Sequence, residues 1–345
     1  METKRITWVD MAKGYGIIAV FIGHLVQGGM LGNFVYSFHL PLFFFLSGYL
    51  FHANVDFLTF LKKKARSILL PYFSLGIFIV FFTVYYEHIF LQKYPTTKMF
   101  TYMLKKNFFD FLLQERYATV WYLAVLLWIN LFMYFIVKLP KLWMQVIPVA
   151  ALLVFGLYRY FVLQGKELFW NFDAALTTCL FFWVGYAFKK KKEILEKVLT
   201  WKFRGILVPI FLVLNIACNV ASFAISGEGL ELWGIQYGVP VLTYLSAFFG
   251  IAMIVVLSSL FLLRPIRYIG EYSLIYFIWH QAVIYPLLDA IYTGFGHDNP
   301  WASVGDYIFI LTTKIIITCV MLTIVNEIIQ RTPLKVMVGK PLKRK

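Results

Sequence analysis

Long apolar stretches alternate along the chain with short polar segments. A helix that crosses the hydrocarbon core of a bilayer needs about 20 mostly apolar residues. The pattern therefore predicts an all-α fold, a polytopic bundle of about ten transmembrane helices. The expected spans are residues 11–29, 34–52, 69–91, 118–137, 145–163, 170–188, 205–226, 238–263, 272–292 and 305–328.

The segments between these spans are short, which predicts a single integral-membrane domain over residues 1–345 with no appended soluble domain. The longest hydrophilic stretches are residues 92–117, expected as an outer loop, and residues 189–204, expected as an inner loop. Within the inner loop, residues 189–197 could form a short surface helix, and they also fit a topology anchor that touches anionic lipid.

Composition supports the membrane interpretation. Hydrophobic residues make up 61% of the chain and charged residues 14%, whereas about 25% of a soluble domain is charged. A soluble globule and a disordered chain are both excluded by these values. The three cysteines are isolated inside apolar runs, so no disulfide framework is expected.

The net charge of +15 is distributed in a way that indicates topology. With the N-terminus placed in the cytoplasm, 24 of the 32 lysines and arginines fall on the cytoplasmic side. This bias predicts that both termini are cytoplasmic and that the protein is a multi-pass protein of the plasma or inner membrane. Because the basic residues lie in short runs between spans and do not form one soluble face, a nucleic-acid partner is not expected.

Two histidines stand out in the first two spans. An ionisable residue within a span costs about 2.5–3.5 kcal/mol and therefore indicates function. His24 precedes and His39 follows an expected hairpin turn at residues 32–33, which places both imidazoles at similar depth in the outer half of the membrane. Pro41 is expected to free backbone groups near His39. Each histidine also fits a purely structural role within the bundle.

Asp10 and Lys13 lie on the face of the first span that carries His24. Eleven residues of helix leave Lys13 about 20° from His24 and about 16 Å closer to the cytoplasm. The two charged residues are therefore expected to line a path from the cytoplasm to His24, although Asp10 also fits a helix cap. Three glycines of this span allow another helix to approach it closely: Gly14, Gly16 and Gly23.

Four cations occupy residues 62–66, and Lys63 and Arg66 are the candidates there for binding phosphate, for which arginine offers bidentate geometry. The same charges would also be explained if they only kept this segment on the cytoplasmic side of the membrane.

Further along, Tyr276 precedes His280 by one helical turn and could orient its ring. Trp121 and Tyr122 begin the fourth span, where interfacial aromatic residues are common. No metal-ligand spacing, phosphate-binding glycine loop or nucleophile elbow is present, and no metal is expected.

Several of these segments resemble a known family. Residues 8–14 (WVDMAKG), the pair Gly23-His24 and residues 38–48 (FHLPLFFFLSG) look like the opening of the acyltransferase family 3 membrane proteins, especially the fucose 4-O-acetylase-like branch. Further landmarks match in order: Arg66 with Leu70-Pro71-Tyr72, then Trp121-Tyr122-Leu123, then residues 270–280 with Tyr276 and His280.

The resemblance implies a ten-helix enzyme that takes an acyl group, usually acetyl, from cytoplasmic acyl-CoA. The acceptor would be a hydroxyl of a cell-surface polysaccharide, glycolipid or lipid-linked sugar. His24 matches the catalytic histidine of the family. Lys13 stands where the family often has an arginine, and Lys63-x-x-Arg66 stands where it has two arginines. Acetyl-CoA is then the donor co-substrate, and the bilayer and a glycan are the partners.

The residues suggest general base catalysis, with His24 removing a proton from the acceptor hydroxyl. His39 or a freed backbone N–H near Pro41 would stabilise the oxyanion. Arg66 and the neighbouring lysines would hold the CoA phosphates. An acyl-histidine intermediate is an alternative route. A transporter or flippase of lipid-linked sugar is the alternative function, since ten spans and aromatic-rich cavities would suit it.

Overall fold

The computed structural model describes residues 5–26, 28–113, 116–164, 168–295 and 304–341. Nearly all of this part is helical, and helices alone account for the regular structure apart from an isolated bridge between Glu231 and Gln236. The chain packs as two compact units, each made of three separate stretches. The first unit is Met1–His52, Phe132–Gly165 and Leu176–Ser273; the second is Ala53–Leu131, Lys166–Ala175 and Leu274–Lys345.

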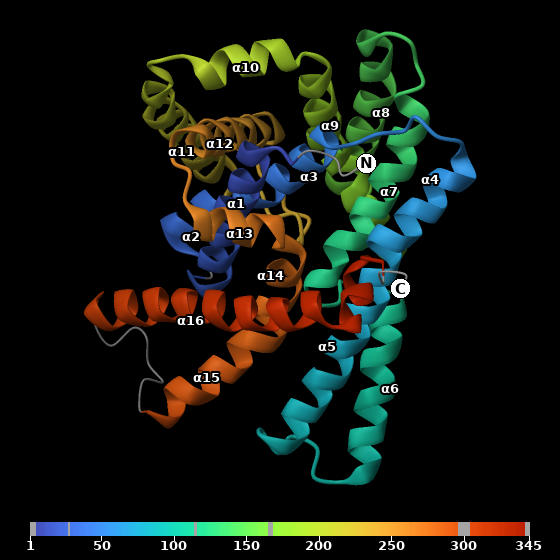
Figure 1. Cartoon of the computed structure of the whole chain (residues 1–345), viewed down its shortest axis with the longest axis vertical. Helices are drawn as coiled ribbons and strands as arrows, with labels where there is room; N and C mark the ends of the chain where they lie inside the picture. The colour runs from blue at the N-terminus through green and yellow to red at the C-terminus, as the bar shows by residue number, and fades with distance from the viewer. Residues whose placement is uncertain (1–4, 27, 114–115, 165–167, 296–303, 342–345) are drawn as a thin grey trace. The chain divides into compact units, whose positions relative to one another are not determined.

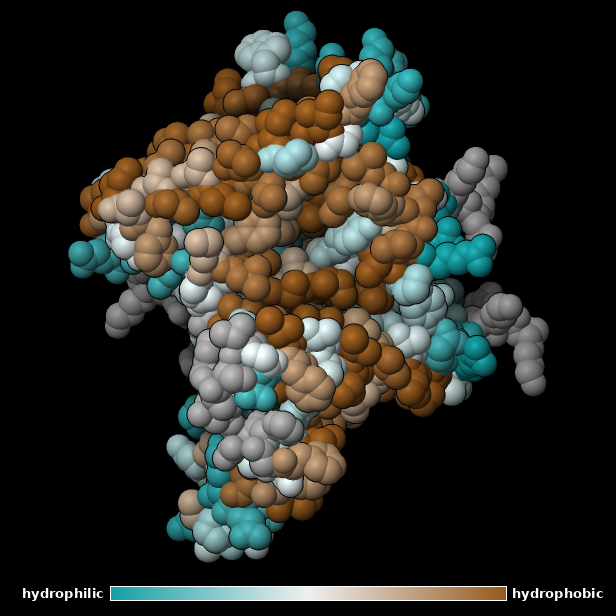
Figure 2. Space-filling model, turned by 90° about the vertical axis from the view of Figure 1, so that its left-hand side faces the viewer, coloured by the Kyte–Doolittle hydropathy of each residue, from teal (hydrophilic) through white to brown (hydrophobic). Residues whose placement is uncertain are grey.

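The prediction of a polytopic helical bundle is confirmed. In the described part of the chain, nine helical runs are long and apolar enough to cross a membrane. The sixth expected span is a helix, α9 (Phe172–Lys190), but it is not among the nine, because Asp173 and two terminal lysines shorten its apolar stretch. Figure 2 shows broad hydrophobic areas on one face of the molecule, with hydrophilic residues at the margins. Such a surface suits contact with lipid.

The first unit is built around α1 (Thr7–Val26), which contacts α2, α3, α12 and α13 (Figure 1). Its buried residues lie on several sides, as expected for a helix enclosed by other helices. The other helices of this unit are α2 (Gly29–Tyr36), α3 (His39–Tyr49), α8 (Leu142–Phe161), α10 (Lys192–Thr200), α11 (Leu207–Ser226), α12 (Pro240–Leu260) and α13 (Arg264–Glu271), together with most of α9. Helix α10 confirms the short helix expected in the inner loop.

Close helix contacts occur where the sequence places glycine in α1. A Cβ at Gly14 would overlap the carbonyl oxygen of Ile266 in α13. A Cβ at Gly270 in α13 would in turn overlap the carbonyl oxygen of Asp10. The backbones of α1 and α13 therefore touch, and this contact holds the N-terminal half of α1 in place within the unit.

The expected turn at residues 32–33 is wrong. Helix α2 runs through these positions, and the chain reverses earlier, where Gly28 and Gly29 have φ of +116° and +67°. Only glycine adopts the φ of Gly28 without strain. The real interruption comes after Tyr36, where α2 ends and α3 begins at His39.

The second unit contains α4 (Phe57–Lys64), α5 (Leu70–Ile89), α6 (Thr97–Leu113), α14 (Ser273–Trp279), α15 (Tyr285–Gly294) and α16 (Val304–Arg331), with the first part of α7 (Trp121–Ile136). Two π-helical turns interrupt these helices, Ala65–Leu69 and His280–Ile284. Asp56 caps α4 by accepting a hydrogen bond from the Thr59 N–H at 2.9 Å. Hydrogen bonding by the side chain and backbone of Thr59 lowers the pKa of Asp56, so the cap is charged at neutral pH.

Residues 92–117, expected as a loop, contain the 17-residue helix α6. It packs along α5 (Figure 1), where the Phe111 ring stacks on Tyr72 at 4.9 Å and the Tyr72 hydroxyl donates to the Phe111 carbonyl at 2.7 Å. Gly76 of α5 makes room for the Phe111 ring. Phe111 is the one buried residue among the described residues of α6, so low overall hydropathy concealed a helix anchored by a single aromatic side chain.

Candidate functional site

His24 and His39 both face the ring of Tyr36 in the first unit. The His24 and Tyr36 ring centroids are 6.2 Å apart, and those of Tyr36 and His39 are 5.0 Å apart, both in edge-to-face geometry. His24 is half-buried near the end of α1, and His39 is 2% exposed at the start of α3. The structure thus brings the two expected histidines together around a residue that the sequence did not single out. Tyr36 lies three residues before His39, and residues three apart in a helix lie on the same face. This spacing could have identified Tyr36 from the sequence.

The His39 ring is held in one orientation by the backbone. Its Nδ1 lies 2.7 Å from the carbonyl oxygen of Val35. A carbonyl oxygen only accepts, so Nδ1 must carry the proton and donate it. In the neutral ring, Nε2 then carries a lone pair and serves as an acceptor or base.

The interruption between α2 and α3 is fixed by buried asparagines of α11. Asn219 donates to the carbonyl of Asn33 at 2.8 Å, and Asn215 donates to the Ser37 hydroxyl at 2.9 Å. Asn215 also donates to the carbonyl oxygen of Ser246 at 2.7 Å. Asn215 is fully buried, on a helix whose other faces are largely exposed. These two residues were not predicted from the sequence. Amide side chains four residues apart in an apolar helix indicate a polar contact with another helix, and this pattern could have identified them.

Asp10 and Lys13 occupy the opposite end of α1 from His24. Helix α1 begins at Thr7, so Asp10 lies in the first turn and is not the N-cap. Its carboxylate is 3.8 Å from Arg5, which also pairs with Glu271 at the end of α13. Asp10 therefore takes part in an ion-pair group that joins α1 to α13. Lys13 is half-buried one turn further along α1.

In the second unit, Arg66 lies within the π-helical turn Ala65–Leu69. Its Nε donates to the carbonyl oxygen of Gly339 at 3.1 Å. The Arg66 side chain is exposed, as are Lys62 and Lys63. Single π-helical turns are frequent at functional sites, and the exposed cations here form a positive surface suited to phosphate.

The second unit also brings together the two later groups of candidates. Thr119 donates to the Ile278 carbonyl at 2.6 Å, and the Tyr122 ring lies 5.0 Å from that of Phe277. Trp121 and Tyr122 are 5% and 7% exposed. They pack among other residues and present little surface to a ligand.

His280 is fully buried in the π-helical turn, and its Nδ1 lies 3.0 Å from the Tyr276 carbonyl and 2.9 Å from that of Phe277. Tyr276 thus meets the His280 ring through its backbone carbonyl and not through its side chain. The Tyr276 hydroxyl instead bonds to Thr323 at 2.7 Å.

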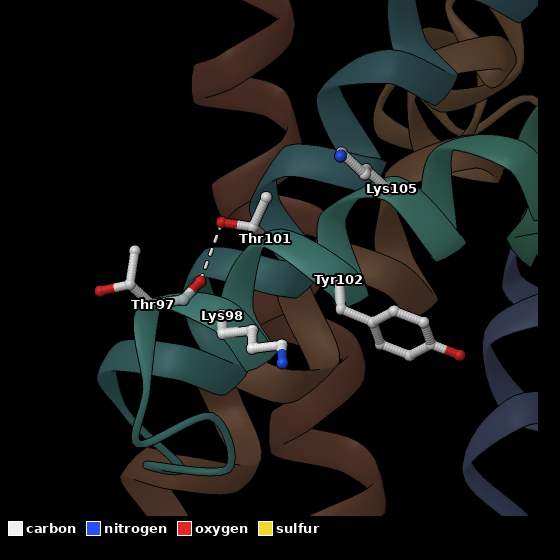
Figure 3. A pocket seen from close by; sticks show the side chains of 5 residues that line it. All are labelled: Thr97, Lys98, Thr101, Tyr102 and Lys105. Atoms are coloured by element: carbon white, nitrogen blue, oxygen red, sulfur yellow. Dashed lines mark hydrogen bonds between the residues drawn. The ribbon is translucent and has the colours of Figure 1, made fainter.

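A pocket of about 380 Å³ opens on the first turns of α6 (Figure 3). It is lined by Thr97, Lys98, Thr101, Tyr102 and Lys105. None of these is among the residues expected to carry chemistry. Within the described part of the chain, no group of three histidine, cysteine, aspartate or glutamate residues is arranged to hold a metal ion.

No curated protein and no solved structure matches the chain. One family model, described as an acyltransferase domain, matches residues 6–324. The matched region contains every residue that the sequence singled out as a candidate, and it ends before the last turns of α16. Together with the membrane-spanning helices, this match over most of its length shows that the chain belongs to the acyltransferase 3 family of multi-pass membrane proteins.

Proposed function

We propose that this acyltransferase is an O-acetyltransferase of the fucose 4-O-acetylase-like kind. It takes acetyl from acetyl-CoA on the cytoplasmic side and transfers it to a hydroxyl of a cell-surface polysaccharide, glycolipid or lipid-linked sugar. Both termini are cytoplasmic in this proposal, as the distribution of lysine and arginine favours. The family membership favours acyl transfer over the alternative of a transporter or flippase.

The observation that carries the proposal is the placement of His24 and His39 on the Tyr36 ring. Two imidazoles in one part of a membrane protein supply the proton acceptors that a hydroxyl nucleophile needs. His24 accepts the proton of the acceptor hydroxyl. The oxygen attacks the thioester carbonyl, and the tetrahedral intermediate collapses with release of the CoA thiolate, which then takes up the proton.

His39 has a different role from the one that its position first suggested. Its Nδ1 proton is used by the Val35 carbonyl, so the neutral ring has no proton to offer an oxyanion. Its Nε2 lone pair is available as a second proton acceptor in the same part of the first unit. His39 thus acts as the second acceptor of the pair.

The donors for the oxyanion come from the start of α3. The first amides of a helix have no partner within that helix, and α3 begins at His39. Pro41 has no N–H, so the amides of His39 and Leu40 are the ones available there. Amides at a helix N-terminus also favour negative charge through the helix dipole.

Arg66, Lys63 and Lys62 bind the phosphates of the donor, since they are exposed together on one positive surface. Lys13 lies on α1 nearer its N-terminal end than His24, and its positive charge favours the negative charge of the donor. In the second unit, Trp121 and Tyr122 are buried, and Tyr276 and His280 are buried and hydrogen-bonded. We assign them to supporting the fold of the second unit.

The test is transfer of radiolabelled acetyl from acetyl-CoA in membranes that contain the protein, read in the glycan and glycolipid fractions. His24→Ala should lower transfer by about 10²–10⁴-fold, the usual value of a general base. His88→Ala is the control, because His88 is half-buried like His24 but bonds the Tyr94 carbonyl and, among the described residues, has no ring contact with Tyr36 or His39. Equal loss in both variants, or equal transfer in all three proteins, would remove His24 as the base.

The same experiment separates the chemical routes. Label that appears on the protein itself in the absence of acceptor would indicate an acyl-histidine intermediate. Absence of transfer by the folded wild-type protein with any glycan fraction would contradict the proposal. Movement of lipid-linked sugar without label would then favour the transporter.

A further inference from the structure

The chain beyond α16 folds back onto the π-helical turn that carries Arg66. Helix α16 ends at Arg331, Thr332 is extended, and a 3-10 helix follows over Pro333–Val338. The Ser74 hydroxyl of α5 donates to the Met337 carbonyl at 2.8 Å, and Arg66 Nε donates to that of Gly339 at 3.1 Å. We call residues 333–340 the carboxy-terminal strap. It lies outside the region that the family model matches.

Gly339 is required where the strap meets this turn. Its φ is +76°, a conformation that favours glycine. A Cβ at this position would lie 2.6 Å from the carbonyl oxygen of Arg66 and 3.4 Å from the Cα of Ser67. The strap therefore passes directly against the backbone of the π-helical turn, and any larger residue would push the two apart.

This contact restrains the side chain of Arg66. The bond from Nε to Gly339 restrains the long side chain, while the side chain is exposed. Among the described residues, none accepts a hydrogen bond from its two terminal amino groups. A guanidinium offers phosphate two parallel N–H donors. With Nε occupied, the edge formed by the two terminal amino groups is the one that remains.

The charge of the strap points to the same ligand. Lys335 and Lys340 lie on the strap, and Lys62 and Lys63 precede Arg66 by a few residues. Bringing further cations to a basic turn costs electrostatic energy unless an anion balances them. A ligand with several phosphates close together meets that condition.

We propose that the carboxy-terminal strap is part of the donor site, and that Gly339 is a positioning residue that holds Arg66 for the phosphates of acyl-CoA. The inference rests on the proposed function, since it takes acyl-CoA as the ligand. A restrained arginine loses less conformational freedom on binding, which raises affinity for the donor without changing the chemical step. The strap should therefore affect KM for acyl-CoA and not kcat.

The experiment compares Gly339→Ala with Gly227→Ala. Gly227 has φ of +73° and also ends a helix, but nothing lies within 4 Å of the Cβ that it would gain. Backbone strain is thus matched, and only the contact with Arg66 differs. We expect Gly339→Ala to raise KM for acetyl-CoA about tenfold, the effect of weakening one charge-assisted bond, and to leave kcat within about twofold. Gly227→Ala should leave KM for acetyl-CoA unchanged.

Two further variants test whether Gly339 acts through Arg66. Ser74→Ala removes the bond from α5 to the strap without placing an atom in the contact, and it should also raise KM for acetyl-CoA. On an Arg66→Ala background, Gly339→Ala should change KM no further, because the residue that it positions is gone. A full additional increase on that background would overturn the inference.

The failures are distinguishable. If the wild-type protein transfers acetyl and binds coenzyme A, but Gly339→Ala and Gly227→Ala have equal KM values for acetyl-CoA, the inference is overturned and the proposed function is not. A loss of kcat at constant KM would also overturn it. A wild-type protein that neither transfers acetyl nor binds coenzyme A would overturn the proposed function, and the inference with it.

Discussion

The Nδ1 atom of His39 lies 2.7 Å from the carbonyl oxygen of Val35, across the interruption between α2 and α3. The last turn of one helix thereby determines the tautomer of the first residue of the next. This hydrogen bond makes the two histidines of the candidate site different from each other. One of them has a fixed ring with an available Nε2, and the other, His24, meets it through Tyr36.

Asparagine and glutamine at position 39 distinguish anchoring from proton transfer. The amide of His39→Asn reaches the place of Nδ1 and can still donate to Val35, but it offers nothing at Nε2. We expect this variant to fold normally and to lose the proposed acetyl transfer by about 10²-fold or more. His39→Gln should lose activity and some thermal stability, since it cannot make the bond to Val35. Wild-type rates in His39→Asn would show that the ring serves only as an anchor.

Tyr36 should act through its ring. Edge-to-face contacts such as those with His24 and His39 contribute about 0.5–1.5 kcal/mol beyond burial. Tyr36→Phe keeps both contacts and should retain activity within about threefold, whereas Tyr36→Ala should lose at least about tenfold because both imidazoles gain freedom. Steady-state rates at saturating donor measure this. A Tyr36→Phe variant as inactive as Tyr36→Ala would assign the role to the hydroxyl instead.

Asn215 should be a determinant of stability as well as of the site. Its amide donates to Ser37 and to the Ser246 carbonyl, in a fully buried position. Asn215→Ala leaves these acceptors without that donor, which costs about 1–3 kcal/mol. Val220→Ala on the same helix is the control, because Val220 is 54% exposed and its loss should cost less than about 0.5 kcal/mol. Thermal unfolding in detergent measures both, and equal effects would contradict a special role for Asn215.

The sequence predicted those features that depend on local composition. Spans follow from about 20 apolar residues in a row, and His24 and His39 follow from the cost of placing an imidazole among them. The close approach at Gly14 was also predictable, since small residues in a span favour helix contacts.

What the sequence did not predict depends on residues far apart in the chain. The end of α2 is fixed by Asn215 and Asn219, which lie 178 and 186 residues after the groups that they bond. Nothing local near residue 37 reveals them, so the turn was expected at residues 32–33 instead. The bond from Arg66 to Gly339 joins positions 273 residues apart. Residues 92–117 looked like a loop because one buried side chain, Phe111, suffices to hold α6 against α5.

The contact between α1 and α13 should be the least tolerant of added volume. A Cβ at Gly14 would overlap the Ile266 carbonyl oxygen, and a Cβ at Gly270 would overlap that of Asp10. These are backbone atoms, which cannot rotate away as a side chain can, so the helices themselves must separate. We expect Gly14→Ala and Gly270→Ala each to cost about 1–3 kcal/mol or more, the usual cost of overpacking. Gly294→Ala is the control, because nothing lies within 4 Å of its added Cβ. The unfolding temperatures of both α1–α13 variants should lie well below that of Gly294→Ala. The proposed acetyl transfer should fall with them, because α1 carries His24. If Gly14→Ala unfolds at the temperature of Gly294→Ala, the backbones of α1 and α13 do not touch as described.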